Sequence, residues 1–147
     1  MKFPPQSSGP RLRREASGQA HPQSVAKKAV LIISHGSRIS KTKKELQGLA
    51  KKLRSLTGFT LVEYAFLEIE SPSIPLGISH CVRKGAAEII ILLNFLNAGR
   101  HVDMDIPRIV EEAAAKFPKV KIRLTKPVGQ HSGILKLFVK MLSPFQK

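Results

Sequence analysis

The run IISHGSR, residues Ile32–Arg38, decides how the chain can fold. It closes an apolar segment that begins at Ala29, and a helical pattern follows it. Apolar residues on both faces are typical of a strand buried in a parallel sheet. Ligands bind beyond the carboxyl ends of such strands, so the run places His35 at an edge where a functional site is expected.

A strand followed by a helix recurs four times along the chain. Strands are predicted over residues 28–34, 60–67, 88–93 and 120–124, and the third is apolar enough to be central. This (βα)4 order predicts an α/β fold, a small doubly wound sheet of four parallel strands in one domain over residues 28–147. A sheet this small has short edges, so we expect a homodimer whose copies complete a shared cleft.

The helices are predicted from their apolar spacing and their end residues. We expect Ser40 to be the N-cap of the first helix, Gly58 to end it, and Ser73 to be the N-cap of the second. Pro107 falls in the first turns of the third helix, where a missing N–H costs little. The buried stripe expected for the first helix is Leu46, Leu49, Ala50, Leu53 and Leu56. The last helix is amphipathic, with Ile134, Leu135, Phe138, Val139 and Leu142 as its apolar residues.

Composition limits the class of protein. The 147 residues fit one domain, and a hydrophobic content of 42% is enough for one packed core. The single cysteine, Cys81, excludes an internal disulfide and fits a reducing compartment, so we expect a cytoplasmic protein. No run approaches the roughly 18 apolar residues that span a bilayer, so we expect no membrane association.

The formal net charge of +15 requires a partner or an explanation. Residues 1–27 are rich in Pro, Ser, Gly and Arg without apolar periodicity, which predicts a disordered basic tail. An organelle transit peptide is the weaker alternative for this segment. A positive field attracts nucleic acid and a small substrate with many carboxylates alike, so charge alone does not choose between them.

Three chemically useful residues follow three successive strands. Glu68 comes 33 residues after His35, and His101 comes 33 residues after Glu68. Carboxyl ends of parallel strands meet at one edge, so two imidazoles and a carboxylate should converge there. Such donors suit Co2+, Fe2+, Ni2+ and Zn2+ and also exchange protons near neutral pH. Glu70 is a rival for Glu68, because the loop geometry is not visible from the sequence.

Other interpretations of these residues are weaker. A single histidine after a strand is commonly a capping residue, and His131 at the start of the last helix fits that role. His80 and His21 are poor ligand candidates, one lying within a helix and the other in the tail. The chain has no Gly-x-Ser-x-Gly elbow for a nucleophilic serine around Ser37, and no glycine-rich nucleotide loop.

Three segments resemble the class II chelatases. They are Ser34–Arg38 (SHGSR), Phe66–Ile74 (FLEIESPSI) and Asn94–Val102 (NFLNAGRHV). The resemblance is to the short, single-domain sirohydrochlorin cobaltochelatases and ferrochelatases, and it covers about Lys28–Leu142. The NAGRH run followed by DMDIP is the specific part of this similarity.

The resemblance implies an activity and a set of site residues. Such enzymes insert a divalent metal into a tetrapyrrole without ATP, on the way to cobalamin or sirohaem, and their short members are homodimers. It assigns metal binding to His35 and His101 and the acidic role to Glu68, with Glu70 as the fallback. No cofactor is expected beyond the substrate ion, which is Co2+ first, then Fe2+ or Ni2+. The tetrapyrrole's peripheral carboxylates are expected to bind at Arg38, Asn97 and Arg100. Arg108 and Lys41 are further candidates for this role, and a plain exposed helix face is the preferred interpretation for both.

Two functions of other classes compete with this one. The first is a metal-carrying or tetrapyrrole-binding module without turnover, which would use the same three ligands. The second is a nucleic-acid binder that uses the basic tail and the first helix. Aromatic residues make up only 5% of the chain, which leaves little for base stacking, so nucleic acid is not the expected partner.

Overall fold

The computed structural model describes residues 26–146. Residues 1–25, which hold most of the expected basic tail, lie outside the described residues, so the disorder of that tail stays a prediction. Among the described residues, no helix is long and apolar enough to cross a membrane.

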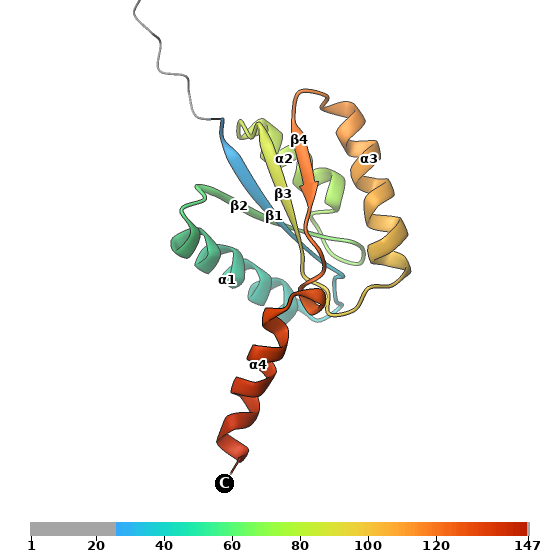
Figure 1. The fold of residues 1–147 in the computed structure, drawn as a ribbon. Coiled ribbons are helices and arrows are strands. Elements are labelled where there is room, and N and C mark those ends of the chain that lie inside the picture. Colours follow the sequence, from blue (N-terminus) through green and yellow to red (C-terminus); the bar gives the residue numbers. More distant parts are fainter. Residues whose placement is uncertain (1–25, 147) are drawn as a thin grey trace, which may run out of the picture.

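In the described part of the chain, four parallel strands form one sheet, as the sequence predicts (Figure 1). The spatial order is β2-β1-β3-β4, with β1 and β3 in the centre. Every neighbouring pair is parallel. The strands are β1 (Lys28–Ser34), β2 (Leu61–Phe66), β3 (Glu88–Leu93) and β4 (Lys121–Leu124). The bounds of β1 and β3 match the prediction, and β2 and β4 are shorter than predicted at their ends.

Within residues 26–146, four α-helices alternate with the strands. They are α1 (Ser40–Thr57), α2 (Ile74–Arg83), α3 (Ile106–Lys116) and α4 (Gly133–Leu142). A five-residue π-helix, η1 (His101–Asp105), runs directly into α3. Two short 3-10 turns, η2 (Val128–Gln130) and η3 (Ser143–Phe145), flank α4.

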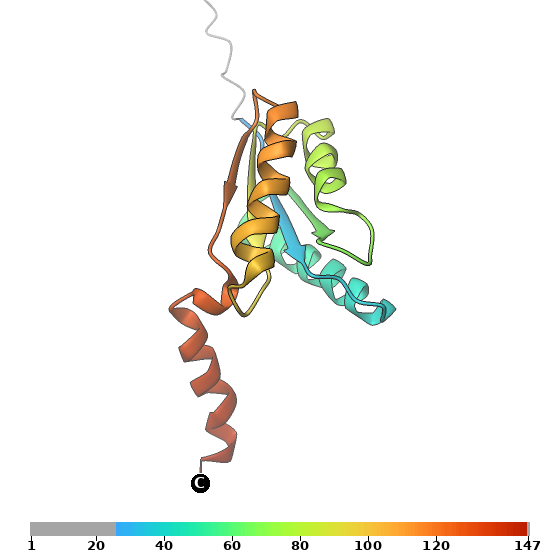
Figure 2. The same cartoon turned by 90° about the vertical axis from the view of Figure 1, so that its right-hand side faces the viewer.

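Helices cover both faces of the sheet, which confirms the doubly wound arrangement (Figure 2). On one face, α1 packs against β1 and β2 through a core cluster of Val30, Ile32, Leu46, Ala50, Val62 and Phe66. On the other face, α2 and α3 enclose the larger cluster, whose fully buried members include Leu31, Ile33, Ile78, Ile89, Ile91 and Ile106. Helix α4 lies on neither face and projects from the carboxyl edge of the sheet (Figures 1 and 2).

Two expectations about α1 are wrong. Ser40 is the first helical residue and Ile39 is the N-cap, because the Ser37 hydroxyl accepts the Ile39 N–H and closes the turn earlier. Leu49 and Leu56, both expected in the buried stripe, are 38% and 81% exposed. At about 100° per residue both lie well round the helix from Leu46 and Ala50, outside the face that meets the sheet. Gly58 ends α1 in the left-handed conformation, as predicted.

Ser73 is the N-cap of α2, as predicted, although its side chain makes no capping hydrogen bond. Its carbonyl oxygen instead accepts the Gly77 N–H at 2.9 Å. Pro107 falls in the first turn of α3, also as predicted.

Candidate metal centre

The site lies where the strand order reverses. The chain passes from β1 out to β2 and then returns to β3 on the other side of β1. The loops that leave the carboxyl ends of β1 and β3 therefore border the crevice in which open α/β sheets bind ligands. His35 directly follows β1, and His101 comes at the end of the loop that follows β3.

The β1 and β2 loops are joined by backbone hydrogen bonds that continue past the strands. The Leu67 N–H donates to the Ser34 carbonyl at 2.9 Å, and the Glu68 N–H donates to the His35 carbonyl at 3.0 Å. Gly36 permits this close approach, because it has φ +105° and a side chain there would overlap the Glu68 carbonyl oxygen. His35 and Glu68 are thus brought together by the backbone itself.

Glu68 and Glu70, the two acidic residues of the loop after β2, make different contacts. Between them Ile69 has φ +71°, a left-handed turn that is unusual for a branched residue. The Glu70 carboxylate accepts the Ser37 N–H at 3.0 Å and so fixes the loop after His35. The Glu68 carboxylate instead lies 2.8 Å from His35 Nε2. Glu68 is therefore the acidic group that faces the histidines.

His101 is positioned by its own helix. It is the first residue of η1, and its Nδ1 lies 2.8 Å from Oδ2 of Asp105, four residues later. A carboxylate can only accept, so Nδ1 carries the hydrogen and the Nε2 lone pair is available for a metal. Asp105 was not among the sequence-predicted site residues. The sequence feature that could have identified Asp105 is its i, i+4 spacing from His101, which makes the two side chains neighbours on a helix.

The three predicted ligands converge. One ligand atom from each of His35, Glu68 and His101 lies within 4.8 Å of the others. The two imidazole rings meet edge to face, with their centroids 5.3 Å apart. About half of each side chain is exposed: 46% for His35, 49% for Glu68 and 50% for His101. The group therefore stands on an open rim that solvent reaches.

The remaining candidates fall as follows. Arg38, Asn97 and Arg100 are exposed on the loops and helix starts that bear the two histidines. Arg108 and Lys41 form i, i+4 ion pairs with Glu112 and Glu45, which supports the exposed-face interpretation. His131 Nδ1 accepts the Gly133 N–H at 3.0 Å, so His131 caps the start of α4, as expected.

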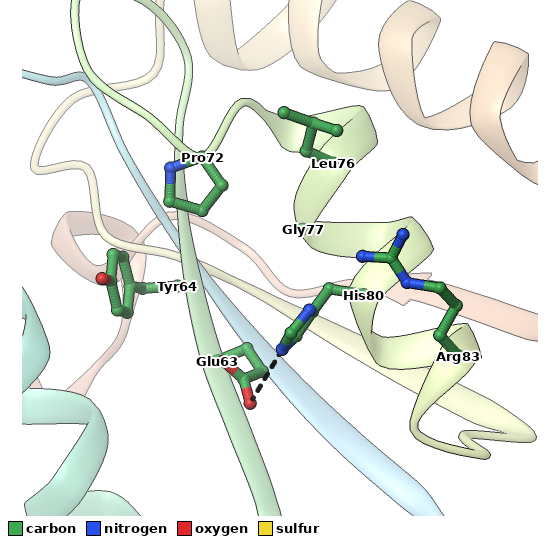
Figure 3. A pocket seen from close by; sticks show the side chains of 7 residues that line it. All are labelled: Glu63, Tyr64, Pro72, Leu76, Gly77, His80 and Arg83. Carbon is green, nitrogen blue, oxygen red and sulfur yellow. Dashed lines mark ion pairs between the residues drawn. The ribbon is translucent and has the colours of Figure 1, made fainter.

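A separate hollow of about 350 Å3 lies between β2 and α2 (Figure 3). His80 and Glu63 face each other across it, with His80 Nε2 3.8 Å from Glu63 Oε1. Lys84 already pairs with the same carboxylate oxygen at 2.8 Å. Because a lysine ammonium neutralises this carboxylate, the hollow lacks the converging donors of the rim. The prediction that His80 is a poor ligand agrees with this geometry.

Comparison with known proteins agrees with the fold and the motifs. The sequence model of the CbiX family matches residues 29–144, nearly the whole of the described chain. The chain belongs to the CbiX family. Its α/β fold and its motifs are therefore those of the chelatase family that the sequence resembles, which confirms that resemblance.

Named CbiX relatives and a solved structure show the range of the similarity. The chloroplastic sirohydrochlorin ferrochelatase of Arabidopsis thaliana is 35% identical over 106 residues, which are 72% of this chain and 47% of that protein. The sirohydrochlorin cobaltochelatase of Sulfolobus acidocaldarius is 33% identical over 100 residues, 68% of this chain and 77% of that protein. The sirohydrochlorin chelatase SirB of Bacillus subtilis subspecies spizizenii, solved in complex with cobalt, superposes with a TM-score of 0.72 at 29% identity. That match covers 80% of this chain and 50% of SirB. The chain thus spans about half the length of the first of these relatives and of SirB.

Proposed function

We propose that the chain is a sirohydrochlorin chelatase, which inserts a divalent metal into a tetrapyrrole without ATP. The observation that supports this most directly is the convergence of His35, Glu68 and His101 on one open rim. Relatives named sirohydrochlorin ferrochelatase and sirohydrochlorin cobaltochelatase add to it. Imidazole and carboxylate donors suit Co2+, Fe2+ and Ni2+ alike. Among these ions we propose Co2+ as the substrate, with Fe2+ as the next candidate.

The proposed metal-binding step exchanges a proton for the ion. His35 Nε2 and Glu68 Oε1 are 2.8 Å apart, so in the proposed step a hydrogen joins these two atoms before the metal binds. The ion would replace this hydrogen, which leaves as a proton to water, and would bind His35 Nε2, His101 Nε2 and the Glu68 carboxylate, with water or substrate in its open positions. Protons compete for the same atoms, so binding should weaken on acidification.

The proposed insertion step reverses that exchange. The ring must lose two pyrrole N–H protons while the ion forms bonds to its nitrogens and leaves the protein ligands. The Glu68–His35 pair takes up one proton as its bonds to the metal break, and His101 Nε2 can take the other before passing it to water. Asp105 would stabilise the protonated His101 that results, through its contact with Nδ1.

The substrate's peripheral carboxylates give the exposed arginines a role. Arg38 adjoins the His35 loop and Arg100 directly precedes His101. Guanidinium groups bind carboxylates through paired hydrogen bonds, and these two would hold the ring over the metal. Asn97 is exposed on the same loop as Arg100, and we propose that its side chain contacts the edge of the tetrapyrrole ring.

We also propose a homodimer, in which a second copy covers the rim. The exposure of the three ligands supports it, because metal transfer to a ring requires that bulk water be kept from the ion. A cytoplasmic location, which the single cysteine favours, is proposed with it.

The test is metal insertion into sirohydrochlorin, followed by the visible absorbance of the ring, with Co2+, Fe2+ and Ni2+ in turn. His101→Ala is compared with His80→Ala, a histidine outside the rim. We expect insertion above the spontaneous rate for the wild type and His80→Ala, and its loss in His101→Ala. Stoichiometric binding of metal or ring without any rate above the spontaneous one would instead indicate a binding module without turnover.

A further inference from the structure

Ile69 is held in a backbone conformation that its own side chain disfavours. The Glu70 N–H donates to the Glu68 carbonyl at 2.8 Å and closes a three-residue γ-turn, with Ile69 at its centre at φ +71°. Branching at Cβ makes this left-handed conformation costly, whereas glycine and asparagine adopt it far more readily. In the described part of the chain, Ile69 is the only residue other than glycine with a positive φ.

The fold of residues 26–146 does not compensate for this strain. Ile69 is 58% exposed and belongs to neither core cluster. The Glu68 carboxylate before it contacts His35, and the Glu70 carboxylate after it accepts a backbone N–H of the β1 loop. A glycine at position 69 would keep the same turn and both contacts without the strain. The isoleucine side chain therefore serves a contact outside the folded chain.

Exposed apolar side chains gather at the same edge of the sheet. Outside residues 133–146, six large apolar residues of the described chain are at least 55% exposed. Four of the six lie on the segments that leave the carboxyl ends of β1, β2 and β3, and these segments also bear the three metal-ligand candidates. The four are Ile39, Ile69, Leu96 and Met104. A concentration of exposed apolar residues around a few polar groups is typical of a surface that binds a ligand with a large apolar area.

We propose that Ile69 contacts the face of the substrate's macrocycle and seats the ring over the metal centre. Leu96 and Met104 extend this apolar contact on the segment that bears His101. The inference rests on the proposed function and adds a substrate-contact residue to its site. A tetrapyrrole has two broad apolar faces and a periphery of carboxylates, so arginines alone would hold it only by its edge. An apolar contact one residue from Glu68 brings the pyrrole N–H groups to the carboxylate that accepts a proton.

The size of the expected effect follows from the area of the contact. Burial of roughly 60–80 Å2 of apolar surface at Ile69 corresponds to about a 10- to 30-fold gain in affinity for the ring. The contact exists in the bound complex before any proton moves, so its loss should raise KM and leave kcat within about threefold. The affinity for Co2+ alone should not change, because all three donors stay in place.

The experiment compares Ile69→Asn with Leu76→Asn. Leu76 is the matched control because it is 55% exposed and lines the separate hollow beside α2. Three quantities are measured on the full-length chain: the thermal midpoint, the Co2+ affinity, and the KM for sirohydrochlorin in metal insertion. For Ile69→Asn we expect a midpoint roughly 2–5 °C higher, because asparagine fits the left-handed turn. We also expect unchanged Co2+ affinity and a KM about 10- to 30-fold higher. Leu76→Asn should change neither the Co2+ affinity nor the KM.

Ile69→Leu is the rescue variant. It removes the branch at Cβ and keeps an apolar side chain, so we expect a KM within about threefold of the wild type together with a raised midpoint. A residue with a purely structural role would not give a more stable protein that binds the ring less well. The pair of Asn and Leu variants therefore separates ring contact from folding.

A wild-type KM in Ile69→Asn, an equal rise in Leu76→Asn, or a lowered midpoint in Ile69→Asn would each overturn the inference. Failure of the proposed function gives a different result. If the wild type binds sirohydrochlorin without inserting metal, the chelatase is contradicted, and the same variants are compared by absorbance titration of the ring. Binding that is 10- to 30-fold weaker in Ile69→Asn then supports the contact, and equal binding overturns it.

Discussion

The two histidines of the rim are held in opposite ways. His35 is fixed by backbone: its carbonyl and that of Ser34 accept hydrogen bonds from the β2 loop, and Gly36 lets the two loops touch. His101 is fixed by a side chain, through the 2.8 Å contact of its Nδ1 with Asp105. The β1 loop should therefore be sensitive to added volume, and the start of η1 should be sensitive to the loss of one carboxylate.

The difference also concerns how each histidine is prepared for a metal. His35 Nε2 lies 2.8 Å from the Glu68 carboxylate, so a hydrogen that joins these two atoms must leave Nε2 before an ion can bind there. His101 has its free nitrogen opposite the one that Asp105 holds, so it can bind an ion without losing a proton. Under the proposed function, one imidazole would thus be coupled to proton transfer and the other would be a fixed ligand.

Removal of either imidazole should have the largest effect. His35→Ala and His101→Ala each delete one of the three donors. We expect at least about 100-fold lower affinity for Co2+, because the loss of a residue that only orients a ligand already costs roughly 10- to 100-fold. Isothermal titration with Co2+ measures this on the folded chain. His80→Ala is the control and should bind like the wild type. Unchanged Co2+ affinity in either rim variant would remove that histidine from the metal centre.

An added methyl group at Gly36 should come next. Gly36→Ala places a side chain against the Glu68 carbonyl at φ +105°, so we expect the free energy of unfolding to fall by about 2–3 kcal/mol. Metal affinity should fall too, because the loops that carry His35 and Glu68 separate. Urea denaturation measures the stability.

Gly48→Ala is the matched control, since this glycine lies within α1 and its side-chain position is open. It should raise stability by up to about 1 kcal/mol through helix propensity. If Gly36→Ala were as stable as the control and bound metal normally, the backbone would not be what positions His35.

The same contrast explains what could be predicted from the sequence. The bounds of β1 and β3 were predictable because their apolar residues are continuous and stop abruptly, and parallel topology then brings the three strand-end residues to one edge. The choice between Glu68 and Glu70 was not predictable. It depends on the left-handed turn at Ile69 and on the hydrogen bond from Ser37 to Glu70, neither of which leaves a pattern in the residue order.

Helix α4 shows a second limit of the sequence. Its amphipathic spacing predicts a helix correctly, but periodicity does not say what the apolar side meets. The direction of α4 is set by the approach of Gly129 to Leu96, a contact between segments that are distant in the sequence. Leu56 is a smaller example, since a residue can keep helical spacing and still fall beyond the edge of the sheet.

Loss of the carboxylate behind His101 should have an intermediate effect. Asp105→Asn keeps the size of the side chain and removes its charge, so His101 is held less firmly. We expect about tenfold weaker Co2+ binding, the lower end of what such supporting residues contribute. Asp103→Asn, an exposed residue of the same π-helix, should stay within about twofold of the wild type. Equal affinities in the two variants would leave Asp105 without a positioning role.

The smallest effect is expected at Glu70, and it separates a supporting acid from a ligating one. In Glu70→Gln the amide oxygen can still accept the Ser37 N–H, so only the charge assistance is lost, about 1 kcal/mol or a few-fold in affinity. Glu68→Gln has the same change of chemistry, but it removes an anionic donor to the ion and the proton acceptor beside His35. Its Co2+ affinity should fall by tenfold or more. If Co2+ affinity fell more in Glu70→Gln than in Glu68→Gln, the two roles would be reversed. Glu70, which accepts the Ser37 N–H of the β1 loop, would then be the acidic metal ligand.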